Sequence, residues 1–219
     1  LDVTLIDQNP HAGGQIYRVP AVTPHRPAPP TRGDQLRGQL SEHAERIELL
    51  GNREVLGIFE QRRLALFGPQ GWETLEAEHL LLATGAYEYV PPFPGWTLPG
   101  VMTPGAAQQL VKSQGVVPGG RVLVAGTGPF LLVVALALHE AGVKVVGICE
   151  TLRRRDVFWK LPSLLADLSM LGQGREYLKR IRRAGIPLWT GRLVTRAEGE
   201  DRLRQVLIAP CNGNWFPDY

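Results

Sequence analysis

The sequence lacks the cysteines that a disulfide-stabilised or zinc-binding protein needs. Its two cysteines, Cys149 and Cys211, form no CxxC motif, and residues 1–148 contain none. Chemistry that passes electrons through a redox-active pair of cysteines is therefore not expected. Cysteine usage of this kind predicts a reducing, cytoplasmic setting.

The sequence also lacks a strong excess of positive or negative charge, and it lacks an uninterrupted apolar stretch that could form a membrane-spanning helix. The net charge is +3 and 21% of the residues are charged, which gives no argument for a nucleic-acid partner. Residues 122–138 carry no charge, but Gly126, Gly128 and Pro129 would break a membrane-spanning helix. The five histidines are scattered, so we expect no metal site. With 219 residues and 44% hydrophobic content, the chain can bury a core like an ordinary globular protein.

What is present is centred on residues 121–150, where an apolar strand, a glycine-rich turn, an apolar helix and a second strand follow one another. The turn is GTGP at residues 126–129, and the second strand ends on Glu150. This order is typical of a Rossmann unit, in which Gly126 and Gly128 would let a pyrophosphate approach the helix N-terminus. Glu150 follows Gly126 by 24 residues, close to the spacing of an acid that binds a ribose hydroxyl.

Two interpretations of this unit stay open. Leu131 replaces the third glycine of the G-x-G-x-x-G pattern, at the position where helix and strand pack closely. The unit either binds a nucleotide through Gly126, Gly128 and Glu150, or it is structural and its turn binds none. Residues 153–155 are all arginine, which fits a site for the 2′-phosphate of NADP or a solvated turn. The solvated turn is the simpler interpretation, because Glu150 would repel that phosphate.

The N-terminal part contains a second candidate site. Residues 1–7 are an apolar stretch that ends on Asp7, as the second strand of a dinucleotide-binding domain does; alternatively, Asp7 caps a loop after an edge strand. The candidate site residues that follow are Gly13, Gly14 and Gln15. The two glycines would let a flat ligand approach the backbone, and the side chain of Gln15 offers a hydrogen-bond donor and an acceptor. No glycine-rich βα unit precedes residue 1, so we expect the sequence to begin one such unit late.

Regular elements are also expected further along the chain. They are a helix over residues 34–45, an antiparallel meander over 54–78, a buried strand over 80–83, a helix over 104–114, a helix or two over 160–184, and strands over 186–208. The strand over 80–83 runs into Ala-Thr-Gly, where Gly85 lets the chain pass against a dinucleotide and Thr84 can donate to it.

The chain resembles the FAD-dependent pyridine nucleotide-disulfide oxidoreductase-like proteins over roughly residues 1–205. The stretches that carry the resemblance are LID, GGQIYR, LLLATGAYE, PPFPGWTLPGVMTPGAAQQL and VLVAGTGPFLL. Within this family it is similar to the flavin subunits of opine oxidase, hydrogen cyanide synthase and dye-linked proline dehydrogenase. The resemblance implies that FAD contacts Asp7, Gly13, Gly14, Gln15, Thr84 and Gly85.

The resemblance also implies an α/β fold of two Rossmann-like units, in which an incomplete FAD domain is interrupted by an NAD(P)-binding-like domain. We expect the chain to divide into four segments. They are a partial FAD-binding domain over residues 1–100, an inter-domain crossing over 101–116, the NAD(P)-binding-like domain over 117–209 and an irregular tail over 210–219.

The implied activity is that of an FAD-dependent oxidoreductase, an opine-type amine dehydrogenase subunit that transfers a hydride from an amine or amino-acid substrate to the flavin. Partner subunits of a hetero-oligomeric dehydrogenase are expected, with NAD(P) or another adenine nucleotide at the second site, and no nucleic acid or membrane span. No catalytic residue is identified. Two alternatives stay open: a non-catalytic nucleotide-binding or scaffold chain, and an NAD(P)H-dependent flavin reductase.

Residues 1–219 by themselves are expected not to bind FAD tightly. The pyrophosphate of a dinucleotide is held mainly by the glycine-rich turn and helix N-terminus after the first strand of its domain. The turn at residues 126–128 would belong to the other domain and could not replace it.

Overall fold

The computed structural model describes residues 2–19, 30–153, 168–212 and 216–217. The chain divides into two compact units, Leu1–Tyr87 and Glu88–Tyr219. We call them the N-terminal unit and the C-terminal unit. Each contains a set of parallel strands followed by loops rich in glycine, so the expected α/β class is confirmed.

The N-terminal unit starts with two short parallel strands and one helix. β1 (Val3–Ile6) pairs with β2 (Ile47–Leu50), and α1 (Arg32–Glu42) connects them along the chain. A capping box starts α1: Thr31 Oγ1 accepts a hydrogen bond from the N–H of Asp34, and the Asp34 carboxylate accepts one from the N–H of Thr31. The helix therefore begins and ends slightly earlier than the expected residues 34–45.

An antiparallel meander completes this unit, as expected for residues 54–78. Its elements are β3 (Glu54–Phe59), the 3-10 turn η1 (Glu60–Arg62), β4 (Arg63–Gly68) and β5 (Gly71–Glu76). Leu64 and Leu66 on the central strand β4 are buried, while Arg63 and Phe67 on either side of them are exposed. This alternation buries one face of the sheet, as the period of two predicts.

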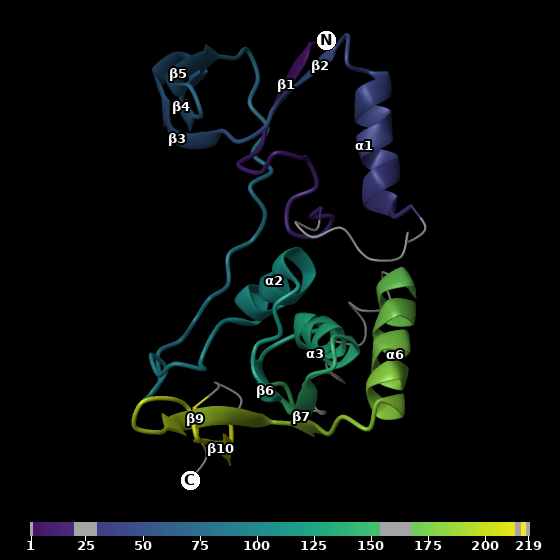
Figure 1. Ribbon diagram of the computed structural model, residues 1–219, viewed down its shortest axis with the longest axis vertical. Coiled ribbons are helices and arrows are strands. Elements are labelled where there is room, and N and C mark those ends of the chain that lie inside the picture. The colour runs from purple at the N-terminus through teal and green to yellow at the C-terminus, as the bar shows by residue number, and fades with distance from the viewer. Residues whose placement is uncertain (1, 20–29, 154–167, 213–215, 218–219) are drawn as a thin grey trace. The chain divides into compact units, whose positions relative to one another are not determined.

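In its described residues, the C-terminal unit combines a parallel sheet with the helices α2, α3 and α6 (Figure 1). In chain order its elements are α2 (Pro104–Gln114), β6 (Arg121–Gly126), α3 (Phe130–Glu140), β7 (Lys144–Glu150), α6 (Leu168–Arg183), β8 (Leu188–Thr190), β9 (Arg192–Glu198) and β10 (Gln205–Pro210). The strands β6, β7 and β8 are parallel in this order, and β9 pairs with β10 in antiparallel fashion. The expected strand–turn–helix–strand order over residues 121–150 is confirmed.

One hydrophobic core holds the C-terminal unit together. It joins α2, α3 and α6 to β6 and β7, and Ala135 of α3 and Ile148 of β7 have no exposed surface. Because α3 is covered on several sides, its sequence is apolar around most of its circumference. Thr103 caps α2, Pro104 is its first residue and Gly115 ends it at a φ of +64°, as the sequence predicts.

The expected buried strand over residues 80–83 is wrong. In the described chain these residues belong to no strand, and the side chains of Leu81 and Leu82 are 90% and 65% exposed. Residues 160–167 of the expected helix lie outside the described residues, while its second half is present as α6.

Candidate functional site

Asp7 stands directly after β1 and shapes the loop that leaves the sheet. Its Oδ1 accepts hydrogen bonds from the backbone N–H and the side-chain amide of Asn9, at 2.8 and 2.9 Å. Its backbone N–H donates to the carbonyl of Leu50, and its carbonyl accepts from the N–H of Arg53, both at 3.1 Å. Asp7 thus caps a loop, and both side-chain bonds fall on one oxygen, which leaves Oδ2 able to accept from a hydroxyl.

The following loop, residues 12–17, is called the first glycine turn. It closes with a hydrogen bond of 3.0 Å from the N–H of Tyr17 to the carbonyl of Gly13. Gly13 has a φ of +138°, and a Cβ there would lie 2.8 Å from the carbonyl oxygen of Tyr17, so a side chain cannot fit. Gly14 faces open space, Gln15 is exposed, and the side chain of Ile16 is 79% exposed. The tip of the turn is therefore free to meet a ligand.

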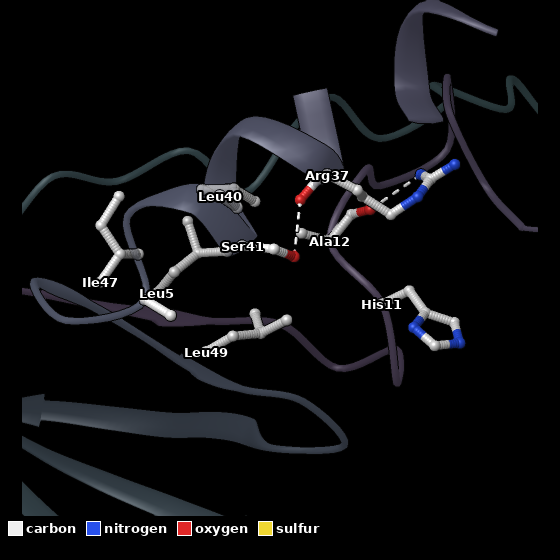
Figure 2. A pocket seen from close by; sticks show the side chains of 9 residues that line it. Leu5, His11, Ala12, Arg37, Leu40, Ser41, Ile47 and Leu49 are labelled. Carbon is white, nitrogen blue, oxygen red and sulfur yellow. Dashed lines mark hydrogen bonds between the residues drawn. The ribbon is translucent and has the colours of Figure 1, made fainter. Parts of the chain in front are cut away.

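A cavity of about 290 Å³ lies behind this turn, between the strands and α1 (Figure 2). It is lined by Leu5, His11, Ala12, Arg37, Leu40, Ser41, Ala44, Ile47 and Leu49. Aliphatic side chains from β1, β2 and α1 form one part of the wall, and His11 and Arg37 lie at the other side (Figure 2). The sequence alone does not indicate this cavity, because its wall comes from three separate segments.

Thr84 and Gly85 lie in the extended segment that follows β5. Gly85 has a φ of +80° and faces open space, which leaves room for a ligand beside the backbone. No hydrogen bond joins Thr84 or Gly85 to Gly13, Gly14 or Gln15 in the part of the chain that the structure describes. Their expected contact with the same cofactor stays a prediction.

In the C-terminal unit, residues 126–128 form what we call the second glycine turn, between β6 and α3. Gly126 has a φ of +149°, and a Cβ there would lie 3.3 Å from Cδ2 of Leu131. Leu131 is 2% exposed and belongs to the hydrophobic core. The side chain that replaces the third glycine therefore packs inward, over the first glycine. Gly128 has a φ of +99° and faces open space.

Glu150 closes the second glycine turn from the end of β7. Its carboxylate oxygens accept hydrogen bonds from the N–H of Gly128, at 3.0 and 3.3 Å, and its Oε1 accepts one from the N–H of Leu152 at 3.0 Å. Burial raises the pKa of the Glu150 carboxyl above its usual range, and the backbone N–H groups oppose this rise. The structure thus brings Gly128 and Glu150 together, as their spacing predicts.

Two threonines add a second link across this turn. The hydroxyl of Thr127 in the turn and the hydroxyl of Thr151 after β7 share a hydrogen bond. The backbone N–H of Thr151 also donates to the carbonyl of Gly126 at 3.0 Å. The sequence alone does not indicate this pair, although each threonine directly follows a predicted site residue.

The residues of both turns can be tested for their fit to a dinucleotide. In the N-terminal unit, Gly14 and Gly85 leave open space beside the backbone and Asp7 keeps an acceptor, which fits a flat ligand with a ribose. In the C-terminal unit, Gly128 leaves space too, but its N–H already donates to Glu150. A nucleotide phosphate would have to compete for that donor, whereas a ribose hydroxyl could donate to the carboxylate.

The two cysteines and the described histidine, aspartate and glutamate side chains form neither a reactive thiol site nor a metal site. Cys149 and Cys211 are buried thiols, and burial, with the nearby Cys211 adding to it, raises the pKa of Cys149 to about 11. Such a thiol is a poor nucleophile at neutral pH. Among the residues whose placement is described, no group of histidine, cysteine, aspartate and glutamate could hold a metal, and no helix has the length and apolar character to cross a membrane.

The chain is similar to subunits of hydrogen cyanide synthase and of opine oxidase. It is 42% identical over 226 residues to hydrogen cyanide synthase subunit HcnB of Pseudomonas aeruginosa, covering 98% of this chain and 47% of the relative. It is 34% identical to an opine oxidase subunit of Agrobacterium tumefaciens, covering 83% of this chain and 39% of the relative. The chain therefore spans about half the length of the curated relatives that it matches.

Solved structures and a family model agree with this assignment. The ferredoxin reductase for the CYP199A2 system of Rhodopseudomonas palustris matches with a TM-score of 0.58 and 22% identity, over 96% of this chain and 50% of that chain. L-proline dehydrogenase from P. horikoshii matches with a TM-score of 0.55 and 17% identity, over 94% and 34% of the two chains. These two likenesses show the fold, and the family model for pyridine nucleotide-disulphide oxidoreductases matches residues 1–212. The chain belongs to the pyridine nucleotide-disulphide oxidoreductases, a family of flavin-dependent oxidoreductases that use FAD and NAD(P).

Proposed function

We propose that this chain is the nucleotide-binding part of an FAD-dependent dehydrogenase subunit that oxidises a carbon–nitrogen bond of an amine or amino acid. The observation that carries the proposal is the pair of glycine turns, each placed after a parallel strand, in a chain of a flavin-dependent family. FAD, when bound, supplies the hydride acceptor. The first glycine turn would hold it through Gly13, Gly14 and Gln15.

The residues of the N-terminal unit would position the cofactor without taking part in bond making. Asp7 would accept a hydrogen bond from a ribose hydroxyl through Oδ2, and Gly85 would let the backbone run against the ligand, with Thr84 as a donor. We retain as part of the proposal the domain bounds 1–100, 101–116, 117–209 and 210–219. The NAD(P)-binding-like part would then offer Gly126, Gly128 and Glu150 to an adenine nucleotide.

The substrate class rests on the names of two relatives. An opine oxidase oxidises an amino acid whose nitrogen carries a second carbon substituent, and a hydrogen cyanide synthase makes a product with a carbon–nitrogen triple bond. The two names share a carbon–nitrogen bond in the substrate or the product, and opine oxidase adds its oxidation, so we infer the oxidation of a carbon–nitrogen bond for the present protein. Both are also subunits, which supports partner subunits for the present protein.

A second candidate is an NAD(P)H-dependent flavin reductase. The position of Glu150 at the end of β7, beside Gly128, favours it, since an acid at this place binds the adenosine ribose of NAD in Rossmann units. In that case the electrons would flow from the pyridine nucleotide to the flavin. The lack of any cysteine in residues 1–148 speaks against onward transfer to a disulfide in this part of the chain.

The test uses the full-length protein with its copurifying subunits. We expect it to purify yellow and to release FAD on denaturation, identified by chromatography against FMN. Anaerobic addition of opines or other secondary amino acids should bleach the flavin absorption, whereas NADH and NADPH should not. Bleaching by NADH or NADPH alone would favour the reductase, and a colourless protein that takes up no added FAD would contradict both candidates. Gly85→Leu should lower the FAD content, because its side chain would occupy the space that the ligand needs.

A further inference from the structure

Arg37 of α1 holds both ends of the first glycine turn. Its Nη1 donates to the carbonyl of Ala12 at 3.2 Å and to the carbonyl of Tyr17 at 2.9 Å. These two carbonyls bracket the exposed residues at the tip of the turn, and one of the two bonds is drawn in Figure 2. A single guanidinium, reached from a helix 25 residues further along the chain, thus fixes the width of the turn at its base.

The guanidinium is itself held in place from the other side. Its Nη2 donates to Oδ1 of Asp34 at 2.6 Å, and the second carboxylate oxygen of Asp34 accepts from the N–H and the hydroxyl of Thr31. The Arg37 side chain is 22% exposed, against 50% for Asp34. Arg37 therefore reaches inward from a fixed anchor at the start of α1, and its orientation is not set by the turn alone.

Close packing leaves the base of the turn little freedom. A Cβ on Gly13 would lie 3.1 Å from Nη1 of Arg37, and a Cβ on the buried Gly33 of α1 would lie 2.7 Å from Cβ of Tyr17. The helix and the base of the turn are thus in direct contact. A Cβ on Gly14, at the tip, would have no atom within 4 Å. Rigidity at the base and free space at the tip are what a pre-organised ligand-binding turn requires.

We propose that Arg37 is a positioning residue for FAD: by binding the carbonyls of Ala12 and Tyr17, it presents Gly14 and Gln15 to the cofactor in a fixed conformation. The inference rests on the proposed function, because it takes the first glycine turn as part of the FAD site. It assigns to Arg37 no contact with the cofactor itself.

The role needs a guanidinium and not merely a positive charge. Nη1 donates to two carbonyls and Nη2 of the same planar group donates to a carboxylate, an arrangement that a single ammonium on a shorter stem cannot reproduce. Arg37→Lys is therefore expected to behave like Arg37→Ala. Free guanidinium ion can occupy the space that Arg37→Ala leaves, so it should restore part of the lost FAD affinity.

The experiment uses the full-length protein, stripped of flavin and titrated with FAD while the flavin fluorescence and visible spectrum are recorded. Arg37→Ala and Arg37→Lys should each weaken FAD binding roughly tenfold or more and alter the shape of the bound flavin's absorption band. Millimolar guanidinium should recover affinity in Arg37→Ala. The matched control is Arg32→Ala, which removes an exposed arginine from the same helix and should change neither affinity nor spectrum.

A second variant separates positioning by Arg37 from the stability of the helix start. Asp34→Asn removes the negative charge, but its amide oxygen can still accept one of the bonds from Arg37 and Thr31, and the two donors of Arg37 to the turn remain. Its FAD affinity should therefore stay within about twofold of the wild type. An equal loss of affinity in Asp34→Asn and Arg37→Ala, or wild-type binding by Arg37→Ala, would overturn the inference while leaving the proposed function intact. If the wild-type protein itself takes up no FAD, the proposed function fails, and the inference with it.

Discussion

The two glycine turns each contain a pair of glycines, but they are held by opposite means. The first glycine turn is held at its base by a cation, Arg37, which binds two of its carbonyls. The second glycine turn is held by an anion, Glu150, which binds the N–H of Gly128. A cation on the carbonyls leaves the N–H groups at the tip available, whereas an anion on the N–H occupies a donor that a phosphate would use. Glycines in a turn therefore show where a ligand fits sterically, but not which donors it would find.

The carboxylates in the two networks also differ in their surroundings. Asp34 is solvent-exposed and receives bonds from Thr31 and Arg37, which lower its pKa to about 2. Glu150 is partly buried and is bonded by backbone N–H groups, and its pKa is raised because burial outweighs these bonds. The stability contributed by these groups should therefore depend on pH in opposite directions.

The largest effect on stability is expected for Leu131→Ala, at the place where the second glycine turn packs against the hydrophobic core. Leu131→Ala would remove a side chain that is 2% exposed and packs over Gly126, leaving a cavity in the only described hydrophobic cluster of the C-terminal unit. We expect a loss of roughly 2–5 kcal/mol in the free energy of unfolding, measured with urea. The neighbouring Phe130→Ala is the control, because its side chain is 41% exposed. Equal losses in the two variants would show that Leu131 does not anchor the turn.

The sequence predicted the elements whose signals lie close together along the chain, but not the packing of Leu131. The strand, turn, helix and strand over residues 121–150 were predictable because the apolar runs and the glycines are contiguous. The meander was predictable from its alternation, and α2 from Thr103, Pro104 and Gly115, since these signals are local. The deviation at Leu131 was visible, but its inward packing against Gly126 depends on the tertiary fold.

Non-local features escaped prediction for a common reason. β2 has only four residues and is defined by its pairing with β1, which no local pattern reports. The apolar residues 80–83 have the composition of a buried strand, yet a strand forms only where a neighbour supplies hydrogen bonds, and in the described chain none does. Arg37 lies 25 residues from Ala12, so its role as a clamp became visible only in the fold.

Glu150→Gln tests the anionic network with an intermediate effect. The amide oxygen of glutamine can still accept from the N–H groups of Gly128 and Leu152, so the turn should persist. The folded-state pKa of Glu150 lies above the reference value of 4.5, so the folded protein binds more protons than the unfolded one. The wild type should therefore lose stability relative to Glu150→Gln as the pH rises from about 4.5 through the raised pKa, and the difference should level off above it.

Urea unfolding at a series of pH values measures this difference. Glu200→Gln, which changes an exposed carboxylate between β9 and β10, corrects for general charge effects. A difference between wild type and Glu150→Gln that stays constant across the acidic range would mean that burial does not perturb this carboxyl.

The smallest effect on stability is expected for Asp34→Asn, which is the counterpart of Glu150→Gln in the N-terminal unit. The folded-state pKa of about 2 lies below the reference value of 3.8, so the unfolded protein binds more protons between the two values. The stabilising contribution of Asp34 should therefore be complete above about pH 4 and disappear as the pH falls towards 2. Because the carboxylate is exposed and its ion pair is screened by water and salt, the change in stability should be small and should shrink in high salt.

An NMR titration of the side-chain carboxyl carbon measures the pKa of Asp34 directly, and hydrogen exchange of the α1 amides reports the stability of its helix. Glu42→Gln, at the opposite end of α1, is the control for removing a charge from that helix. A measured pKa near 3.8 would show that Thr31 and Arg37 do not hold this carboxylate in solution. The anchor of Arg37 would then be weak, and the contrast between a turn held by a fixed cation and a turn held by a buried anion would reduce to the second turn alone.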